Sequence, residues 1–231
     1  MIIFDNVTLR YHYDDFDLLK GASFTLADGV NTVLADVQSG KSSICKLLTK
    51  DVAPTSGRIT VDGQDIASIT NSNLDILYLP TNPAFFENRS VQYNIEYPLR
   101  VRKYPKNERI ERAIKAANEL GIDELDAKVK SLPPEKRKLV ALARGLTVKR
   151  KTVLFDDFFA FDGSSECLAE MDNILQRFQG ATCVILISDA RLATGNTVVL
   201  DGGVAVYQGH ADGARKIVGE MDWLVTKCSK L

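Results

Sequence analysis

The apolar residues of this chain form short strand-like runs near both ends and take helical spacing in the middle. Four runs rich in apolar and β-branched residues are typical of buried strands, at 31–34, 76–79, 152–155 and 182–187. From about 91 to 130 the pattern is helical, and its apolar positions are Ile110, Ala113, Ile114, Ala117 and Leu120. Apolar strands that alternate with helices predict a buried parallel sheet.

Turn and cap residues divide these elements. An Asp-Gly turn within 57–66 separates two strand-like runs, and Pro80 is expected to stop the strand before it. Gly121 is expected to cap a helix, and Pro133 with Pro134 to begin the next one. The expected buried stripe of that next helix is Leu139, Leu142, Ala143 and Leu146. No linker or repeat is evident, so we expect one α/β domain over residues 1–231 with a helical insertion at about 82–134.

Charge and cysteine content narrow the classes of function. The 231 residues include 29 basic and 30 acidic side chains, so no global charge draws the chain to nucleic acid or an anionic membrane. Its basic clusters lack interleaved aromatic residues, and we expect no nucleic-acid partner. The four cysteines show no Cys-x-x-Cys, which argues against a zinc site and favours reduced thiols in the cytosol. No signal peptide or bilayer-spanning run is recognised, so a role at a membrane would require another subunit.

A phosphate-binding motif follows the first of the apolar runs. Residues 35–43 read Ala-Asp-Val-Gln-Ser-Gly-Lys-Ser-Ser, against the usual Gly-x4-Gly-Lys-Ser/Thr. In such a loop Lys41 would bridge the β- and γ-phosphates, and the Ser42 hydroxyl would bind Mg²⁺. The candidate nucleotide-binding residues are Ala35, Gln38, Ser39, Gly40, Lys41, Ser42 and Ser43. The alternative is a chance Gly-Lys-Ser in a surface turn.

An acidic pair, Asp156 and Asp157, ends the apolar run at 152–155. Asp156 would hold Mg²⁺ through its water shell, and Asp157 stands where a catalytic base would orient the attacking water. The alternative is a strand-end turn whose aspartates cap the next element. Together with the phosphate loop, the pair favours a nucleotide site.

In their order along the chain, these motifs resemble those of the nucleotide-binding subunit of ABC transporters. Residues 140–146 are similar to the helix after that family's signature, 94–106 to the helical subdomain of its importer-type ATPases, and 198–203 to its late hairpin. The resemblance implies a P-loop NTPase fold of the ABC-ATPase type, with an N-terminal antiparallel β portion. It also implies that Tyr11 stacks on adenine, with Tyr13 as the alternative. An ordinary strand tyrosine is the other interpretation of Tyr11.

Several positions depart from the family pattern. The signature Leu-Ser-Gly-Gly-Gln aligns with Leu132, Pro133, Pro134, Glu135 and Lys136. The serine hydroxyl is lost there, and neither proline has an N–H to donate. The resemblance places Thr81 at the loop glutamine, Ser188 at the switch histidine and Asp157 at the catalytic glutamate, while Asp162 matches the D-loop aspartate. The residues that hold ATP and Mg²⁺ are kept, and nearly every residue that senses the γ-phosphate is altered.

The resemblance implies an ATP-binding, energy-coupling subunit of a membrane transporter with weakened hydrolysis. Its implied cofactors are ATP and Mg²⁺, and its implied partners are an integral membrane permease subunit and either a second copy of this chain or another ABC ATPase chain. We expect a cytoplasmic protein, peripheral to the membrane through its permease. One alternative is a pseudo-ATPase that acts as an ATP-binding regulatory or scaffold module. Another is an ABC protein with no role in transport.

Overall fold

The computed structural model describes residues 1–11, 16–36, 39–159 and 165–219. The chain divides into two compact units. The sheet unit comprises Met1–Pro80 and Lys151–Leu231, and the helical unit comprises Thr81–Arg150. The interpretation of residues 1–231 as one nucleotide-binding domain with a helical insertion stays a prediction.

An antiparallel sheet forms the N-terminal part of the sheet unit, with strand order β2-β1-β4-β5. Strand β1 (Ile2–Leu9) lies in the middle and pairs antiparallel with β2 (Leu19–Leu26) and with β4 (Ser56–Val61). The short β5 (Gln64–Asp65) folds back on β4 after the Asp-Gly turn. The N-terminal antiparallel portion predicted from the sequence is therefore confirmed.

A second, mainly parallel sheet has the order β10-β9-β3-β8-β7-β6. Its strands are β3 (Val30–Ala35), β6 (Ile76–Pro80), β7 (Thr152–Asp156), β8 (Thr182–Ile187), β9 (Asn196–Asp201) and β10 (Val204–His210). Only β10, at one edge, runs antiparallel to its neighbour. Every residue of β7 and β8 is buried, which explains their continuous apolar runs. Pro80 was expected to stop this strand after Leu79, but it is itself the last residue of β6, because an edge strand tolerates the missing N–H.

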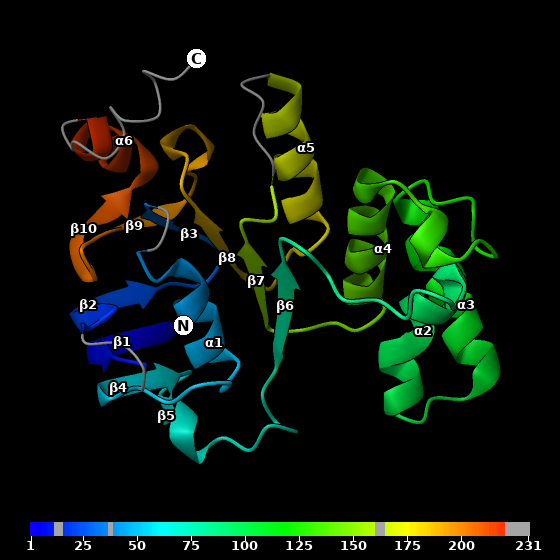
Figure 1. Ribbon diagram of the computed structural model, residues 1–231, viewed down its shortest axis with the longest axis horizontal. Coiled ribbons are helices and arrows are strands. Elements are labelled where there is room, and N and C mark those ends of the chain that lie inside the picture. Colours follow the sequence, from blue (N-terminus) through cyan, green and yellow to red (C-terminus); the bar gives the residue numbers. More distant parts are fainter. Residues whose placement is uncertain (12–15, 37–38, 160–164, 220–231) are drawn as a thin grey trace. The chain divides into compact units, whose positions relative to one another are not determined.

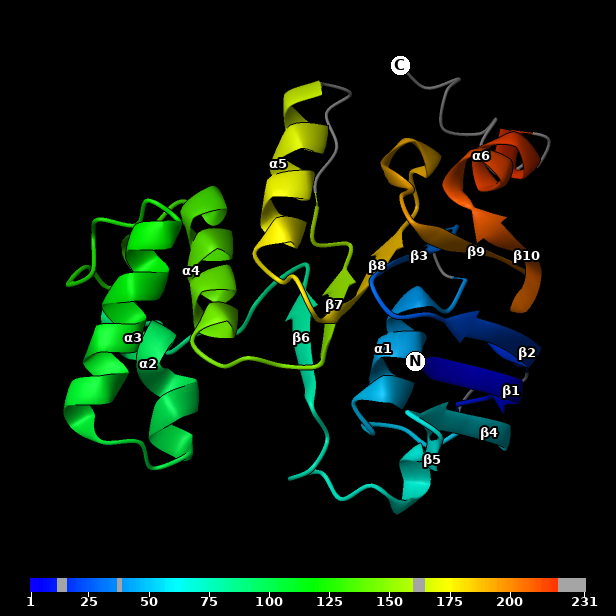
Figure 2. The same ribbon diagram turned by 180° about the vertical axis from the view of Figure 1, so that it is seen from behind.

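Helix α1 (Lys41–Leu48) joins the two sheets into one core. Figures 1 and 2 show it between the antiparallel sheet and strands β7 and β8. Its buried residues Ile44, Cys45 and Leu48 belong to a cluster that also contains side chains from both sheets. The sheet unit also holds α5 (Ser165–Gln176) and α6 (Ala211–Gly219). The start of α1 is thereby fixed against the ends of the parallel strands.

The helical unit consists of α2 (Val91–Val101), α3 (Lys106–Glu119) and α4 (Pro134–Leu146), which pack side by side (Figure 2). The predicted helical stretch from about 91 to 130 is broken at Lys103, whose φ is 60°, and ends near Gly121, whose φ is 63°. Ile114 is also not buried as its spacing suggests but 37% exposed, because α3 turns Ala113, Ala116 and Ala117 to the core instead. Pro133 and Pro134 do begin α4, as predicted.

Three short 3₁₀ turns, at Ile66–Ser68, Val129–Ser131 and Ala190–Leu192, complete the secondary structure of the described residues. Within those residues, no helix combines the length and the apolar character that crossing a bilayer requires.

Candidate functional site

The loop between β3 and α1 carries the predicted phosphate motif. Ala35 is fully buried at the end of β3, and Gly40 precedes α1 with a φ of 91°. That left-handed conformation suits glycine, and it turns the chain into the helix so that Ser43 and Ile44 donate their N–H groups to the Gly40 carbonyl. Ser39 folds back on the same loop, because its hydroxyl and its N–H both reach the Asp36 carbonyl. Gln38 lies outside the described residues.

Lys41 is a buried lysine, 6% exposed, at the first position of α1. Its ammonium donates to the carbonyl oxygens of Ala35 and Asp36, each at 2.9 Å, and to the Ser188 hydroxyl at 2.6 Å. Ser188 directly follows β8, the strand that pairs with β3. Ser188, which the resemblance places at the switch histidine, therefore contacts the phosphate-loop lysine.

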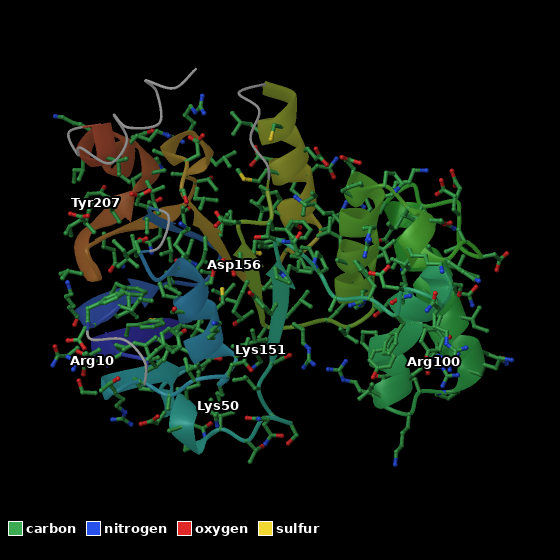
Figure 3. The ribbon with its side chains drawn as sticks, viewed as in Figure 1. Arg10, Lys50, Arg100, Lys151, Asp156 and Tyr207 are labelled. Carbon is green, nitrogen blue, oxygen red and sulfur yellow. The ribbon has the colours of Figure 1, made fainter. Side chains whose placement is uncertain are left out.

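Ser42 and Asp156 form the second contact of the site. The Ser42 hydroxyl donates to Asp156 Oδ1 at 3.1 Å. Asp156 is 4% exposed and lies at the carboxyl end of β7 (Figure 3). A hydroxyl and a carboxylate are the hard oxygen ligands that Mg²⁺ prefers, and Mg²⁺ usually takes only one or two carboxylates beside substrate phosphates. These residues fit a Mg²⁺ ion, although the described residues hold no group of three His, Cys, Asp or Glu side chains for a metal.

Tyr78, on β6, is a residue of the site that the sequence prediction missed. Its hydroxyl donates to Asp156 Oδ2 at 2.8 Å. Burial, followed by this hydrogen bond, raises the pKa of Tyr78, so the phenol remains a donor at neutral pH. The one signal in the sequence is a hydroxyl on the otherwise apolar strand Ile-Leu-Tyr-Leu-Pro.

Asp157 follows Asp156 with a φ of 44°, and its N–H donates to the Leu186 carbonyl at 2.9 Å. Cys45, on the core side of α1, has its pKa raised well above the usual value, first by burial and then by the negative charges of Asp156 and Asp157. The acidic pair thus carries charge next to the buried face of α1.

Tyr11 is half-buried beside the start of α1. Its hydroxyl lies 3.0 Å from the Ser43 hydroxyl, and the Lys46 ammonium lies 5.4 Å from the centre of its ring. The alternative adenine-stacking residue, Tyr13, and the D-loop candidate Asp162 both lie outside the described residues.

The signature-like residues lie at the start of α4 in the helical unit. Leu132 is part of that unit's core, whereas Pro133, Pro134, Glu135 and Lys136 are exposed. Pro133 is the N-cap and contributes no side-chain cap. Lys136 forms an ion pair with Glu124, which lowers the pKa of that carboxyl group. Thr81 is exposed and directly follows β6 in the chain.

The sheet unit therefore brings together most of the candidates: Tyr11, Ala35, Ser39, Gly40, Lys41, Ser42, Ser43, Asp156, Asp157 and Ser188. Thr81 and the residues from Leu132 to Lys136 belong to the helical unit. Chemically, the gathered residues offer a buried ammonium, a hydroxyl–carboxylate pair and the positive end of the α1 dipole, which together suit an anionic ligand with a divalent cation.

Comparisons with known proteins agree with this chemistry. A family model described as "ABC transporter" matches residues 19–160. The chain is 35% identical over 151 residues to a molybdate/tungstate import ATP-binding protein of Thermococcus kodakarensis. That alignment covers 64% of this chain and 45% of that protein. It is 30% identical over 209 residues to an sn-glycerol-3-phosphate import ATP-binding protein of Brucella abortus. That alignment covers 87% of this chain and 59% of that protein. The chain thus spans about half the length of the curated relatives it matches.

A solved structure has the same fold. The chain superposes on a bacterial Atm1-family ABC exporter with ATP bound, with a TM-score of 0.81 and 23% sequence identity. The match covers 99% of this chain and 42% of the exporter chain. The chain therefore shares the fold of that structure.

Proposed function

The chain belongs to the ABC transporter family, and on that basis we propose that it binds MgATP and serves as the ATP-binding, energy-coupling subunit of a membrane transporter with weakened hydrolysis. The observation that carries this proposal is the position of buried Lys41 beside the Ser42–Asp156 pair, where the start of α1 meets the carboxyl end of β7. A buried ammonium at a helix N-terminus suits the negative charge of a nucleoside triphosphate, and the adjacent hydroxyl–carboxylate pair suits its magnesium ion.

Binding would begin with the release of Lys41 from its present acceptors. The γ-phosphate would take the place of the Ala35 and Asp36 carbonyls and of the Ser188 hydroxyl as acceptors for the ammonium. Ser42 and Asp156 would hold Mg²⁺, which supplies charge neutralisation for the phosphates. Tyr11 would then lie under the adenine ring, with its hydroxyl near Ser43.

Hydrolysis is expected to be slow because the residues that would lie near the γ-phosphate have shorter side chains than the family's residues or already form other hydrogen bonds. Asp157 is one methylene shorter than glutamate, and a displacement of about 1 Å can cost roughly a hundredfold in rate. Ser188 has no imidazole, and its hydroxyl accepts a hydrogen bond from Lys41. Thr81, at the loop-glutamine position, would contribute a hydroxyl in place of an amide. Catalysis would then rest mainly on Lys41 and on the charge that Mg²⁺ supplies.

Calorimetry with ATP and Mg²⁺ tests the binding step. Wild type is expected to bind, and Lys41→Ala is expected to lose most of the affinity because the main cationic contact is removed. Lys20→Ala is the matched control, since Lys20 is an exposed lysine on β2 of the same unit. Absence of binding by wild type, or equal affinity in Lys41→Ala, would refute the proposal.

A pseudo-ATPase is the second candidate function, and the start of α4 favours it. Pro133 and Pro134 supply no N–H, and Lys136 is already paired with Glu124. The chain would then act as an ATP-binding regulatory or scaffold module. Steady-state phosphate release by the purified chain, alone and with any co-purifying subunit, separates the two, because a pseudo-ATPase binds ATP without turnover in either condition.

The transporter role is supported by the names of the relatives, which are import ATP-binding proteins. By that similarity we propose an importer whose membrane-spanning permease is a separate subunit, with this chain on the cytoplasmic side. The second nucleotide site would come from a second copy of this chain or from another ABC ATPase chain. Purification of the tagged chain from its native membrane should recover an integral membrane protein. Recovery of the chain with no membrane partner would favour an ABC protein outside transport.

A further inference from the structure

Tyr78 reaches the candidate site from a strand that carries none of the predicted motifs. Its hydroxyl donates to Asp156 Oδ2 at 2.8 Å, while the other oxygen of the same carboxylate, Oδ1, accepts from Ser42 at 3.1 Å. Each oxygen of the buried carboxylate therefore accepts a hydrogen bond from a hydroxyl group. One donor belongs to the phosphate-loop helix and the other to the edge strand β6.

The strand register explains how Tyr78 reaches this position. In the parallel pair of β6 and β7, Tyr78 lies opposite Leu154 and Pro80 lies opposite Asp156. Side chains two residues apart on a strand share a face of the sheet, so Tyr78 and Asp156 are diagonal neighbours on one face. Only a long side chain spans that diagonal. The Tyr78 ring packs against the main core cluster, which leaves the hydroxyl at the far end of the ring in contact with the carboxylate.

The two contacts together restrict rotation of the Asp156 carboxylate. With Oδ2 held by Tyr78, Oδ1 remains on the side of Ser42, the hydroxyl that would bind the metal. Mg²⁺ demands near-ideal octahedral geometry, so a carboxylate that is free to rotate binds its water shell less well. Residues that orient a metal ligand in this way typically change metal affinity by about 10- to 100-fold when they are removed.

We propose that Tyr78 is a positioning residue for Mg²⁺, which acts by orienting the carboxylate of Asp156 through its hydroxyl. The inference rests on the proposed MgATP site. The alternative is that the Tyr78 hydroxyl only satisfies its own hydrogen-bonding need at the edge of the core. The two differ in one measurable respect, because only a positioning role couples the hydroxyl to the metal.

The test is the Mg²⁺ dependence of ATP binding in Tyr78→Phe, which keeps the ring and removes the hydroxyl. ATP affinity is measured by calorimetry across a series of free Mg²⁺ concentrations and in excess EDTA. We expect the Mg²⁺ concentration for half-maximal enhancement of ATP binding to rise about tenfold or more. Affinity for metal-free ATP is expected to stay close to that of wild type.

Two further variants make the result specific. Tyr207→Phe removes another tyrosine hydroxyl of the sheet unit, which donates to the His210 carbonyl and lies away from Asp156 (Figure 3), and it should leave the Mg²⁺ dependence unchanged. In an Asp156→Asn background, Tyr78→Phe should produce no further change in Mg²⁺ dependence, because the group through which it acts is gone.

The outcomes separate this inference from the proposed function. If wild type shows no Mg²⁺-dependent ATP binding, the proposed site fails. If wild type shows it and Tyr78→Phe keeps the same Mg²⁺ dependence, only the role of Tyr78 is overturned. An equal loss of ATP affinity with and without Mg²⁺ in Tyr78→Phe would also overturn it, since that result indicates a purely structural contribution.

Discussion

Asp157 directly follows the buried strand β7 with its backbone in the left-handed region, at a φ of 44°. Aspartate and asparagine adopt this region more readily than longer side chains do. Its N–H is held by the Leu186 carbonyl, so the backbone cannot relax freely when the side chain changes. The residue that the resemblance places at the catalytic glutamate is therefore also a residue that suits the local backbone.

Restoring the glutamate alone is expected to help little. Asp157→Glu should leave ATP turnover within about threefold of wild type, because groups that act as a unit are strongly non-additive. It should also lower the free energy of unfolding by about 1 kcal/mol. Asp157→Glu with Ser188→His should raise turnover more than either change alone, by about tenfold or more. Steady-state phosphate release measures the rates. Brisk turnover by the unmodified chain would contradict the prediction and imply that other residues have taken over these roles.

The buried thiol of Cys183, on β8, gives a prediction about ionisation. Burial raises its pKa from 9.0 to about 11, so at pH 8 its thiolate fraction is about a hundredfold lower than for an ordinary thiol. Alkylation of Cys183 in the native protein should therefore be slower by at least about that factor than in the protein unfolded in urea. Peptide-resolved mass spectrometry after timed iodoacetamide labelling measures both rates. Equal rates would show that β8 opens readily in the native state.

At the scale of elements, the contact between β1 and β4 depends on a glycine. Gly57, with a φ of 82°, lies so close to β1 that a Cβ atom would stand 2.2 Å from the Asn6 carbonyl oxygen. Gly63, in the turn that ends the same strand, has a φ of 79° and no heavy atom within 4 Å of a Cβ. Alanine substitutions at these two glycines therefore separate the energetic cost of backbone strain from that of steric overlap.

Gly63→Ala should lower the free energy of unfolding by about 1 kcal/mol, the cost of a left-handed alanine. Gly57→Ala should lower it by about 3 kcal/mol or more, because overlap with a backbone atom adds to the same strain. Urea unfolding of wild type and the two variants gives the comparison. Similar losses in both variants would mean that β1 and β4 move apart at little cost.

The elements differ in how well local sequence predicts them. The apolar runs of β3, β7 and β8 have signatures within a few residues, and each of these strands was predicted correctly. The contacts that complete the site join segments far apart in the chain, as Lys41 and Ser188 do. Whether Tyr78 reaches Asp156 depends on the register of β6 against β7, for which no single stretch of sequence carries a signal. The ion pair of Lys136 with Glu124 was missed for the same reason.

At the scale of the whole molecule, the prediction about association rests on the start of α4. The resemblance places the family's signature there, and in that family the signature contacts the γ-phosphate of ATP held by the opposite subunit. A helix ordinarily offers its first N–H groups to an anion, but Pro133 and Pro134 have none. Glu135 adds a negative charge that suits its own helix dipole and opposes a phosphate. The nearby cations Lys136 and Arg137 are engaged by Glu124 and Glu87 of the same unit.

We therefore expect that ATP alone does not drive a stable homodimer of this chain. A ligand shifts an equilibrium only by its differential affinity for the two states, and a face with two prolines and a glutamate adds little affinity for a triphosphate held by another copy. Sedimentation velocity with and without MgATP, under non-hydrolysing conditions, should show the same species. Any dimer should require a membrane subunit or another partner chain. If MgATP does convert monomer to dimer, Lys136→Ala and Arg137→Ala identify whether these cations leave their carboxylate partners to hold the phosphate. Loss of the dimer in those variants would mean that Lys136 or Arg137 replaces the phosphate contacts of the signature.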